Sequence, residues 1–128
     1  MNEARLGPGL TGALHGDMVP KFLATRNAAG VPNVVPIISL DADDDRTLVF
    51  GAFLIQKTRA NLIADPRVAA CVVTEELCAW TMQLRFRGFE QSGPRLERMN
   101  RRGMFRYNAY LGVRQVGVLD LEEVTHRF

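Results

Sequence analysis

The chain has 128 residues, of which 47% are apolar, with 16 basic and 14 acidic residues and a formal net charge of +2 at pH 7. This length predicts a single domain over residues 1–128, and the apolar fraction excludes a disordered chain. The net charge is too small to indicate a nucleic-acid partner, and no apolar run approaches the roughly 20 residues that span a bilayer. We therefore expect neither nucleic acid nor a membrane among the partners.

The N-terminal segment, residues 1–9, ends in a Gly-Pro-Gly sequence. It lacks the apolar block of a secretory signal peptide, so we expect a flexible arm over 1–9 and a cytoplasmic protein. Cys71 and Cys78 are the two cysteines, which are too few for a disulfide framework, and their spacing matches no metal or redox motif.

The first third of the chain predicts a β-hairpin. One helical turn is expected over 10–16. Strands are expected over 21–26 and 31–40, because the short segment 27–30 between these apolar runs contains a glycine. Pro36 has no N–H to donate to a ladder, so its strand should lie at a sheet edge or carry a bulge, beside a ligand.

The middle of the chain predicts a short helix between two buried strands. The acidic segment 41–45 is expected to be a solvated turn, and it lacks the glycine that a calcium-binding loop needs at its sharp turn. Strands are expected over 47–53 and 67–74. The helix between them should cover 58–64, ending before Pro66 because proline disfavours helix in the preceding residue.

The next strand alternates with a period of two. Its apolar residues, Trp80, Met82, Leu84 and Phe86, alternate with polar ones, which predicts one face on the core. Gly88 then allows a bend or a bulge.

The last part of the chain predicts one more helix and one more strand. The helix should open at Gly93-Pro94, since proline suits the first helical position. Residues 107–110 either continue it or form a separate turn. A strand is expected over 113–121, followed by a charged tail over 122–128. The total is a mainly β fold of six strands, mostly antiparallel, that closes or nearly closes into a barrel.

Lys57 and Thr58 stand where the short helix begins. A helix N-terminus presents unpaired N–H groups and a partial positive charge, so a lysine and a hydroxyl are the residue types that complete a phosphate site there. The alternative is that Lys57 is solvated and Thr58 is only an N-cap. The local pattern leaves both interpretations open.

The side chains of a self-contained catalytic site are missing from the sequence. His15 and His126 are the only histidines, and neither has a ligand partner nearby, so no metal site is expected. There is no nucleophile elbow, Walker loop or dinucleotide fingerprint. If the protein is an enzyme, a bound cofactor is expected to carry the reaction. The pattern assigns no catalytic residue.

The order of these segments resembles one family. Phe22–Thr25 followed by Gly30–Ile37 resembles the opening hairpin of the pyridoxamine 5'-phosphate oxidase-like, FMN-binding split-barrel family. A second set of segments resembles that family's phosphate-binding region, namely Leu48–Gly51, the Lys57-Thr58-x-x-Asn61-Leu62 pattern and Asp65–Val68. Leu84–Gly88 is similar to the strand before its late helix. The resemblance covers about residues 20–121 and is strongest to the small FMN-binding proteins.

The resemblance implies a homodimeric, six-stranded antiparallel split β-barrel with FMN at the subunit interface. It implies that the flavin ring lies along Pro36, Ile37, Ile38 and Ser39. The ring and ribityl chain would be lined by Phe50, Gly51, Ala52, Ile55 and Gln56. The phosphate would be held by Lys57 and Thr58, with Asn61 nearby, and the other subunit would contribute Trp80 and Gln83.

Two other interpretations stay open. One is a relative that binds the deazaflavin F420 or haem, and the other is a cofactor-free dimeric module that binds a partner through its arginines. Members of the family often carry an arginine near the phosphate, but 36–40 and 53–55 contain none. Arg59, Arg85 and Arg87 are the candidates to replace it. The pyridoxal-phosphate-binding residues of the true oxidases have no clear counterparts, so that specific activity is not expected.

Overall fold

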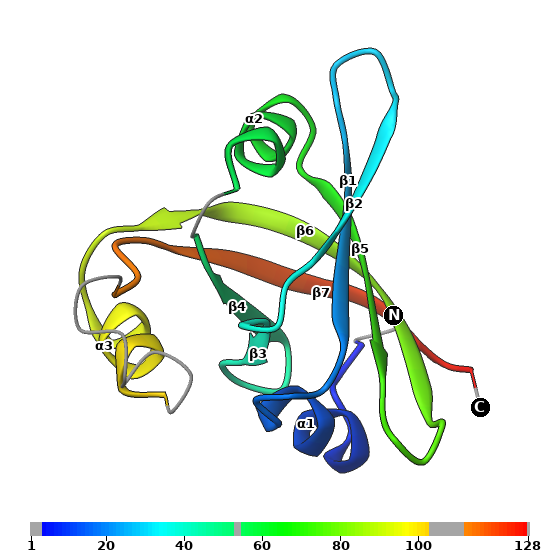
Figure 1. Ribbon diagram of the computed structural model, residues 1–128. Helices are drawn as coiled ribbons and strands as arrows, with labels where there is room; N and C mark the ends of the chain where they lie inside the picture. The colour runs from blue at the N-terminus through cyan, green and yellow to red at the C-terminus, as the bar shows by residue number, and fades with distance from the viewer. Residues whose placement is uncertain (1–3, 53–54, 103–111, 128) are drawn as a thin grey trace.

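One antiparallel sheet organises the chain (Figure 1). The computed structural model describes residues 4–52, 55–102 and 112–127. Within them the sheet has seven strands in the order β2-β1-β5-β6-β7-β4-β3. The strands are β1 (Lys21–Arg26), β2 (Pro32–Pro36), β3 (Asp41–Ala42), β4 (Thr47–Gly51), β5 (Arg67–Val73), β6 (Ala79–Glu90) and β7 (Val116–His126). The helices are α1 (Pro8–His15), α2 (Gln56–Ala64) and α3 (Pro94–Arg101).

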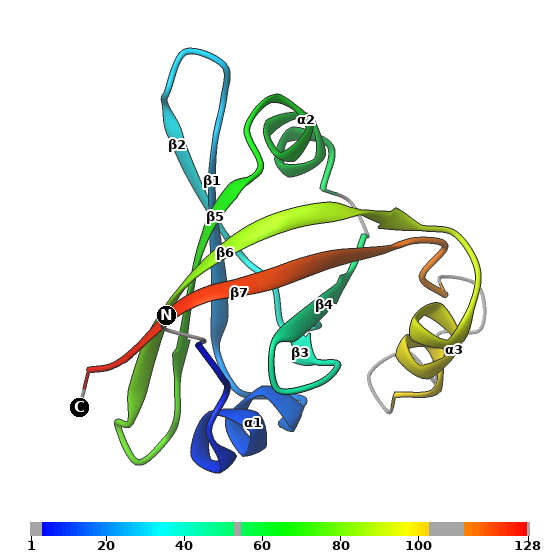
Figure 2. The same ribbon diagram turned by 180° about the vertical axis from the view of Figure 1, so that it is seen from behind.

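The sheet curls into a half-barrel. Figures 1 and 2 show the long strands β6 and β7 crossing β1 and β5, with α1 and α2 at opposite ends of the curl and α3 at its side. The curl has a local cause in β6, where the register against β7 shifts between Phe86 and Gly88. This is the bulge predicted at Gly88, whose φ of 153° a side chain would rarely adopt.

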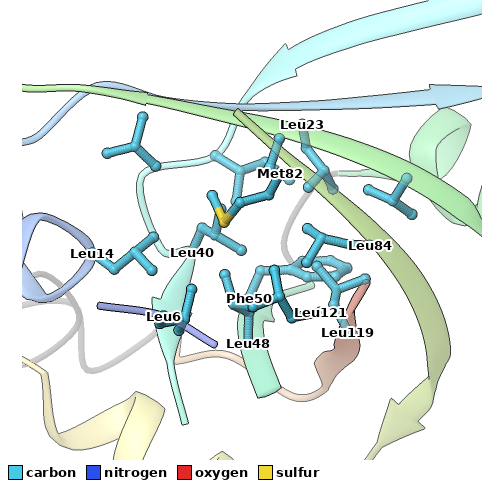
Figure 3. Close-up of a cluster of buried hydrophobic side chains, with 14 of the residues drawn as sticks. Leu6, Leu14, Leu23, Leu40, Leu48, Phe50, Met82, Leu84, Leu119 and Leu121 are labelled. Atoms are coloured by element: carbon cyan, nitrogen blue, oxygen red, sulfur yellow. The ribbon is translucent and has the colours of Figure 1, made fainter. Parts of the chain in front are cut away.

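The barrel interior is filled by mainly aliphatic side chains from α1, α2, β1 and the strands β4 to β7 (Figure 3). On β4, Leu48 and Phe50 point into this core, and both are fully buried. Val49, between them, packs instead into a second cluster with Met99 of α3 and Val118 of β7. Both faces of β4 are therefore covered, and the strand is fully buried where it approaches α2.

The strand count differs from the expected six because the acidic segment contributes β3. Asp41 and Ala42 pair with Val49 and Leu48 of β4. The solvated turn expected over 41–45 is therefore only partly correct: Asp44 and Asp45 are exposed in a bend, whereas Asp41 meets His15 Nδ1 at 2.6 Å and Asp43 meets Arg95 Nε at 2.8 Å. Charge pairing makes an acid-rich edge strand tolerable.

The N-terminal segment also differs from the expected flexible arm where it is described, over residues 4–9. Leu6 is buried, its N–H donates to Asp45 O at 2.7 Å, and α1 already begins at Pro8. The helix is longer than the single turn expected because Leu10 and Leu14, four residues apart, share one buried face. Residues 4–9 are thus held against the barrel.

Other boundaries move for similar reasons. Strand β2 ends at Pro36, not at 40, and it is an edge strand, as the missing proline donor requires. Strand β7 runs to His126, because the charged residues expected as a tail pair in register with β6. Strand β4 ends at Gly51. The alternatives for 107–110 lie outside the described residues.

Candidate functional site

The segment after β2 leaves the ladder and exposes an apolar side chain. Pro36 and Ile38 are exposed, with Ile38 46% accessible, whereas Ile37 and Ser39 are buried. The Ser39 hydroxyl accepts a hydrogen bond from the Gly51 N–H at 2.9 Å. The segment predicted to line a flavin ring is thereby joined to the end of β4, which was predicted to line the same ring.

At the end of β4, the Phe50 side chain was expected to line the flavin ring. Phe50 is fully buried in the barrel, and its ring meets Phe89 edge-on with centroids 6.3 Å apart. Its side chain belongs to the core. Ala52 is half-buried and its N–H donates to Gln115 O at 2.9 Å, next to the start of α2.

Helix α2 begins without a side-chain cap. Ile55 occupies the N-cap position and its side chain makes no capping hydrogen bond, whereas its carbonyl accepts the Arg59 N–H at 2.7 Å. The N–H groups of the first turn precede that bond and point out of the helix end. Gln56 and Lys57 are exposed at this end. Thr58 is not the N-cap, because the helix starts two residues earlier than 58.

The two polar residues predicted beside Lys57 face inward. Thr58 and Asn61 are 2% and 4% exposed. Asn61 donates from Nδ2 to Thr25 Oγ1 at 3.1 Å, which fastens α2 to β1. Of the three side chains predicted around the phosphate, Lys57 is the one placed at the surface; the ligand roles of Thr58 and Asn61 stay predictions.

A cleft lined by two arginines opens beside the start of α2. Its volume is about 520 Å³, and its lining is Ala52, Arg59, Gln91, Arg114 and Gln115. The Arg59 guanidinium donates to the Gln115 side chain and lies 4.2 Å above the centre of the Phe89 ring. Among the described lining residues there is no carboxylate, so this cleft is positively charged.

Three lining residues of this cleft were missed by the sequence analysis. Arg114 and Gln115 precede β7, and they reach α2 only because Gly51 pairs with Val116. Gln91 directly follows the last residue of β6. No local pattern signals such long-range pairing. Of the three arginines considered as substitutes for the phosphate ligand, Arg59 lines the cleft, whereas Arg87 is bonded to Asp120 at 2.5 Å.

Trp80 and Gln83 belong to two other clefts. Trp80 lines a cleft of about 500 Å³ with residues of α1 and of the β5–β6 turn, and its ring stacks on His126 at 4.9 Å. Gln83 is exposed on β6 and lines a cleft of about 330 Å³ with Arg26 and Arg67. The prediction that a second subunit contributes them to the cofactor site remains a prediction.

A buried cation underlies the segment after β2. Burial and then the Arg102 guanidinium lower the pKa of Lys21 from 10.5 to about 8, while Asp41 and Asp17 act in the opposite direction. Within the described ranges, no group of three or more His, Cys, Asp or Glu residues could hold a metal ion. No described helix has the length and apolarity needed to cross a membrane.

Solved structures with this architecture are found although their sequences are distant. An FMN-binding protein from Syntrophomonas wolfei aligns with a TM-score of 0.77 at 15% identity, covering 92% of this chain and 83% of its own. An F420 reductase aligns with a TM-score of 0.71 at 18% identity, covering 94% and 98%. The haem storage protein HutZ from Vibrio cholerae aligns with a TM-score of 0.68 at 15% identity, covering 95% and 94%. No protein-family model and no curated protein matches the sequence.

The chain has the split-barrel fold of the pyridoxamine 5'-phosphate oxidase-like proteins. The resemblance seen in the sequence is confirmed at the level of the fold. In this split barrel, the end of β4 connects the two halves of the predicted site. Gly51 bonds to Ser39 of the predicted ring segment, and Ala52 bonds to Gln115, which bonds to Arg59 of the predicted phosphate segment.

Proposed function

We propose that the protein is an FMN-binding flavoprotein, an oxidoreductase or electron carrier, that acts as a cytoplasmic homodimer. The observation that carries the proposal is the uncapped start of α2, with Lys57 exposed there and a cleft lined by Arg59 and Arg114 beside the helix start. The FMN-binding neighbour of the same fold supports it.

The charges of this region suit a phosphate monoester. Such a group carries close to two negative charges at neutral pH, and lysine, arginine and helix-terminal N–H groups are its usual partners. Arg59 is bonded to a neutral amide, so its charge is available to an anion. Arg26 and Arg95, by contrast, are bonded to carboxylates at 2.6 and 2.8 Å. The residues present therefore fit an FMN phosphate.

The segment after β2 suits the flat ring. Pro36 and Ile38 present apolar surface, and Phe22, which pairs with Pro36, extends it across the two strands. A flavin supplies one- or two-electron transfer when bound, so the chain needs only to bind, orient and shield the ring. We infer that a second copy of the chain covers this apolar surface and completes the site.

Titration of the apo protein with FMN, followed by quenching of flavin fluorescence, tests the proposal. Lys57→Ala should raise the Kd for FMN roughly ten- to hundredfold, because one charge-assisted contact contributes about 1.5–3 kcal/mol. Arg5→Ala is the matched control: it also removes an exposed cation, but one bonded to Asp45 at 2.5 Å and outside every segment predicted to hold the cofactor. It should leave the Kd unchanged.

Two results would count against the proposal. A purified protein that is colourless and binds no FMN in the titration contradicts it outright. An unchanged Kd in Lys57→Ala moves the phosphate to the side of the cleft lined by Arg59 and Arg114. Parallel titrations with F420 and haemin distinguish FMN from the ligands of the two other neighbours, since each has its own visible absorption band.

A further inference from the structure

Lys21 is a buried cation whose donors are all engaged by carbonyl groups. Its residue exposure is 0%, and Nζ donates to Leu14 O at 2.6 Å, Gly16 O at 2.9 Å and Ile38 O at 3.2 Å. An ammonium group has three donors, so each is used once. Lys21 thus joins the end of α1 to the segment that follows β2.

Arg102 holds the next carbonyl along the chain. It follows α3, and its side chain is 12% exposed. Nη1 donates to Ser39 O at 2.6 Å, and Nη2 donates to Asp17 at 3.1 Å. Two cations from different parts of the fold therefore hold two consecutive carbonyl groups, those of Ile38 and Ser39.

The held segment has few other backbone constraints. The Ile37 N–H donates to Lys21 O at 2.8 Å, and the Leu40 N–H closes a turn onto Ile37 O at 3.2 Å. Beyond Pro36 the described segment is no longer paired as a strand. The direction in which Ile38 projects its exposed side chain depends on the peptide groups that the two cations hold.

Stability alone does not account for a lysine at this position. Burying a charge is costly, and replacing buried ionic groups by apolar ones of similar size is often neutral or stabilising. What an apolar side chain cannot do is hold three carbonyl oxygens at one point. The cost of burying the Lys21 charge therefore indicates that the positions of these carbonyl groups are important to the protein.

We infer that Lys21 and Arg102 are positioning residues for the flavin ring, which they orient by fixing the peptide groups of Ile38 and Ser39. This inference rests on the proposed function. It assigns the two cations no contact with the flavin. They act through the segment 37–39, whereas Lys57 acts on the phosphate.

The test uses Lys21→Met and Arg102→Gln in the full chain, with Arg87→Gln as control. Arg87 also forms an ion pair, with Asp120, but on β6 and β7. In the absence of flavin, amide hydrogen exchange at 37–40 should become at least tenfold faster in both variants and stay unchanged in the control. Arg102→Lys keeps the charge but loses the paired donors, so it should fall between Arg102→Gln and wild type. If Lys21→Met does not fold, Arg102→Lys and Arg102→Gln still test the inference.

Measurements on the FMN-loaded variants distinguish a positioning role of the two cations from a purely structural one. At saturating FMN, both variants should shift the visible absorption bands and the midpoint potential, whereas saturated Lys57→Ala should keep the wild-type spectrum. Unchanged exchange at 37–40, or an unchanged spectrum and potential, overturns the inference while leaving FMN binding intact. A wild-type protein that binds no FMN overturns the proposed function instead, and the exchange measurement still reports whether the cations hold the segment.

Discussion

Position 117 requires a glycine because the Phe50 ring lies against it. A Cβ added there would lie 2.2 Å from Phe50 Cζ, well inside van der Waals contact, and both residues sit in paired, buried strands. We expect Gly117→Ala to lower the free energy of unfolding by about 1–3 kcal/mol, because a fully packed core must shift to admit the methyl group. Denaturant unfolding measures this.

The control for this prediction is another glycine. Gly12 lies within α1 and a Cβ there would meet nothing within 4 Å. Gly12→Ala should raise stability by up to about 1 kcal/mol, since alanine favours helix. Equal effects of the two substitutions, in sign and size, would show that the contact between Phe50 and Gly117 is not the cause.

Lys21 also predicts how stability depends on pH. Its pKa is about 8 in the folded protein, against 10.5 ordinarily. Between these values the unfolded chain binds the proton and the folded chain does not, so stability rises with pH. Relative to that of Lys21→Met, the free energy of unfolding of the wild type should rise by on the order of 1–3 kcal/mol between pH 8 and 10.5. Below pH 8 the difference should be constant.

This comparison isolates one group among several. Lys21 is faced by Arg102, Asp17 and Asp41, and Asp41 also contacts His15. Lys21→Met removes the lysine and keeps these neighbours, so the difference between the two proteins reports on the lysine. Parallel unfolding free energies across that range in the two proteins would contradict the lowered pKa.

At the residue scale, the sequence located an exposed lysine at the start of α2, whose role as phosphate anchor stays a prediction, and missed the buried polar residues of that helix. Lys57 is exposed at the start of α2, as a phosphate ligand must be. Thr58, Asn61 and Leu62 follow the spacing of one helix face, and the fold buries all three. Polar residues on a buried face suggest a ligand when only the sequence is known. Here Thr25 supplies the partner, from a strand whose position the local pattern cannot predict.

At the scale of elements, the bond between Asn61 and Thr25 fixes α2 on the barrel. Both side chains are buried and lie 3.1 Å apart. Asn61→Ala should lower the free energy of unfolding by about 1–3 kcal/mol, because it leaves the buried Thr25 hydroxyl without a partner. It should also weaken FMN binding, because the helix start that carries Lys57 would be less well placed.

A double-mutant cycle checks the assignment. Thr25→Val removes the other partner, and the double variant should be more stable than the sum of the two single losses predicts, by about 1 kcal/mol. Strictly additive losses would mean that the two side chains do not stabilise α2 through their contact.

Elements with a clear period were predicted well, and those formed by distant pairing were not. Strand β6 alternates as expected, since its core face is visible in the sequence. Strand β3 has no such pattern; its two residues become a strand only because β4 lies beside them and arginines of α3 meet the neighbouring carboxylate. The end of β7 is a similar case. Its charged residues form a strand because they pair with β6.

At the scale of the whole molecule, one apolar surface lies on the edge of the sheet. It consists of Phe22, Val34, Pro36 and Ile38, and we name it the β2 surface. Phe22 and Pro36 are register partners, and Val34 and Pro36 lie on the same face of β2 because side chains alternate along a strand. A contiguous apolar surface on an edge strand marks an interaction site. The proposed flavin segment includes two of its residues.

The β2 surface therefore predicts that dimer formation and FMN binding depend on each other. Val34→Lys, at a residue that is 63% exposed, should raise the dimer dissociation constant at least tenfold, because a charge would have to be buried at the contact. Sedimentation velocity measures this, and the FMN Kd should rise in parallel, since a site shared by two subunits is lost when they separate. Leu77→Lys makes the same change at a 69% exposed residue outside the β2 surface and should alter neither quantity. A monomeric Val34→Lys protein that binds FMN as tightly as wild type would place the whole site within one chain.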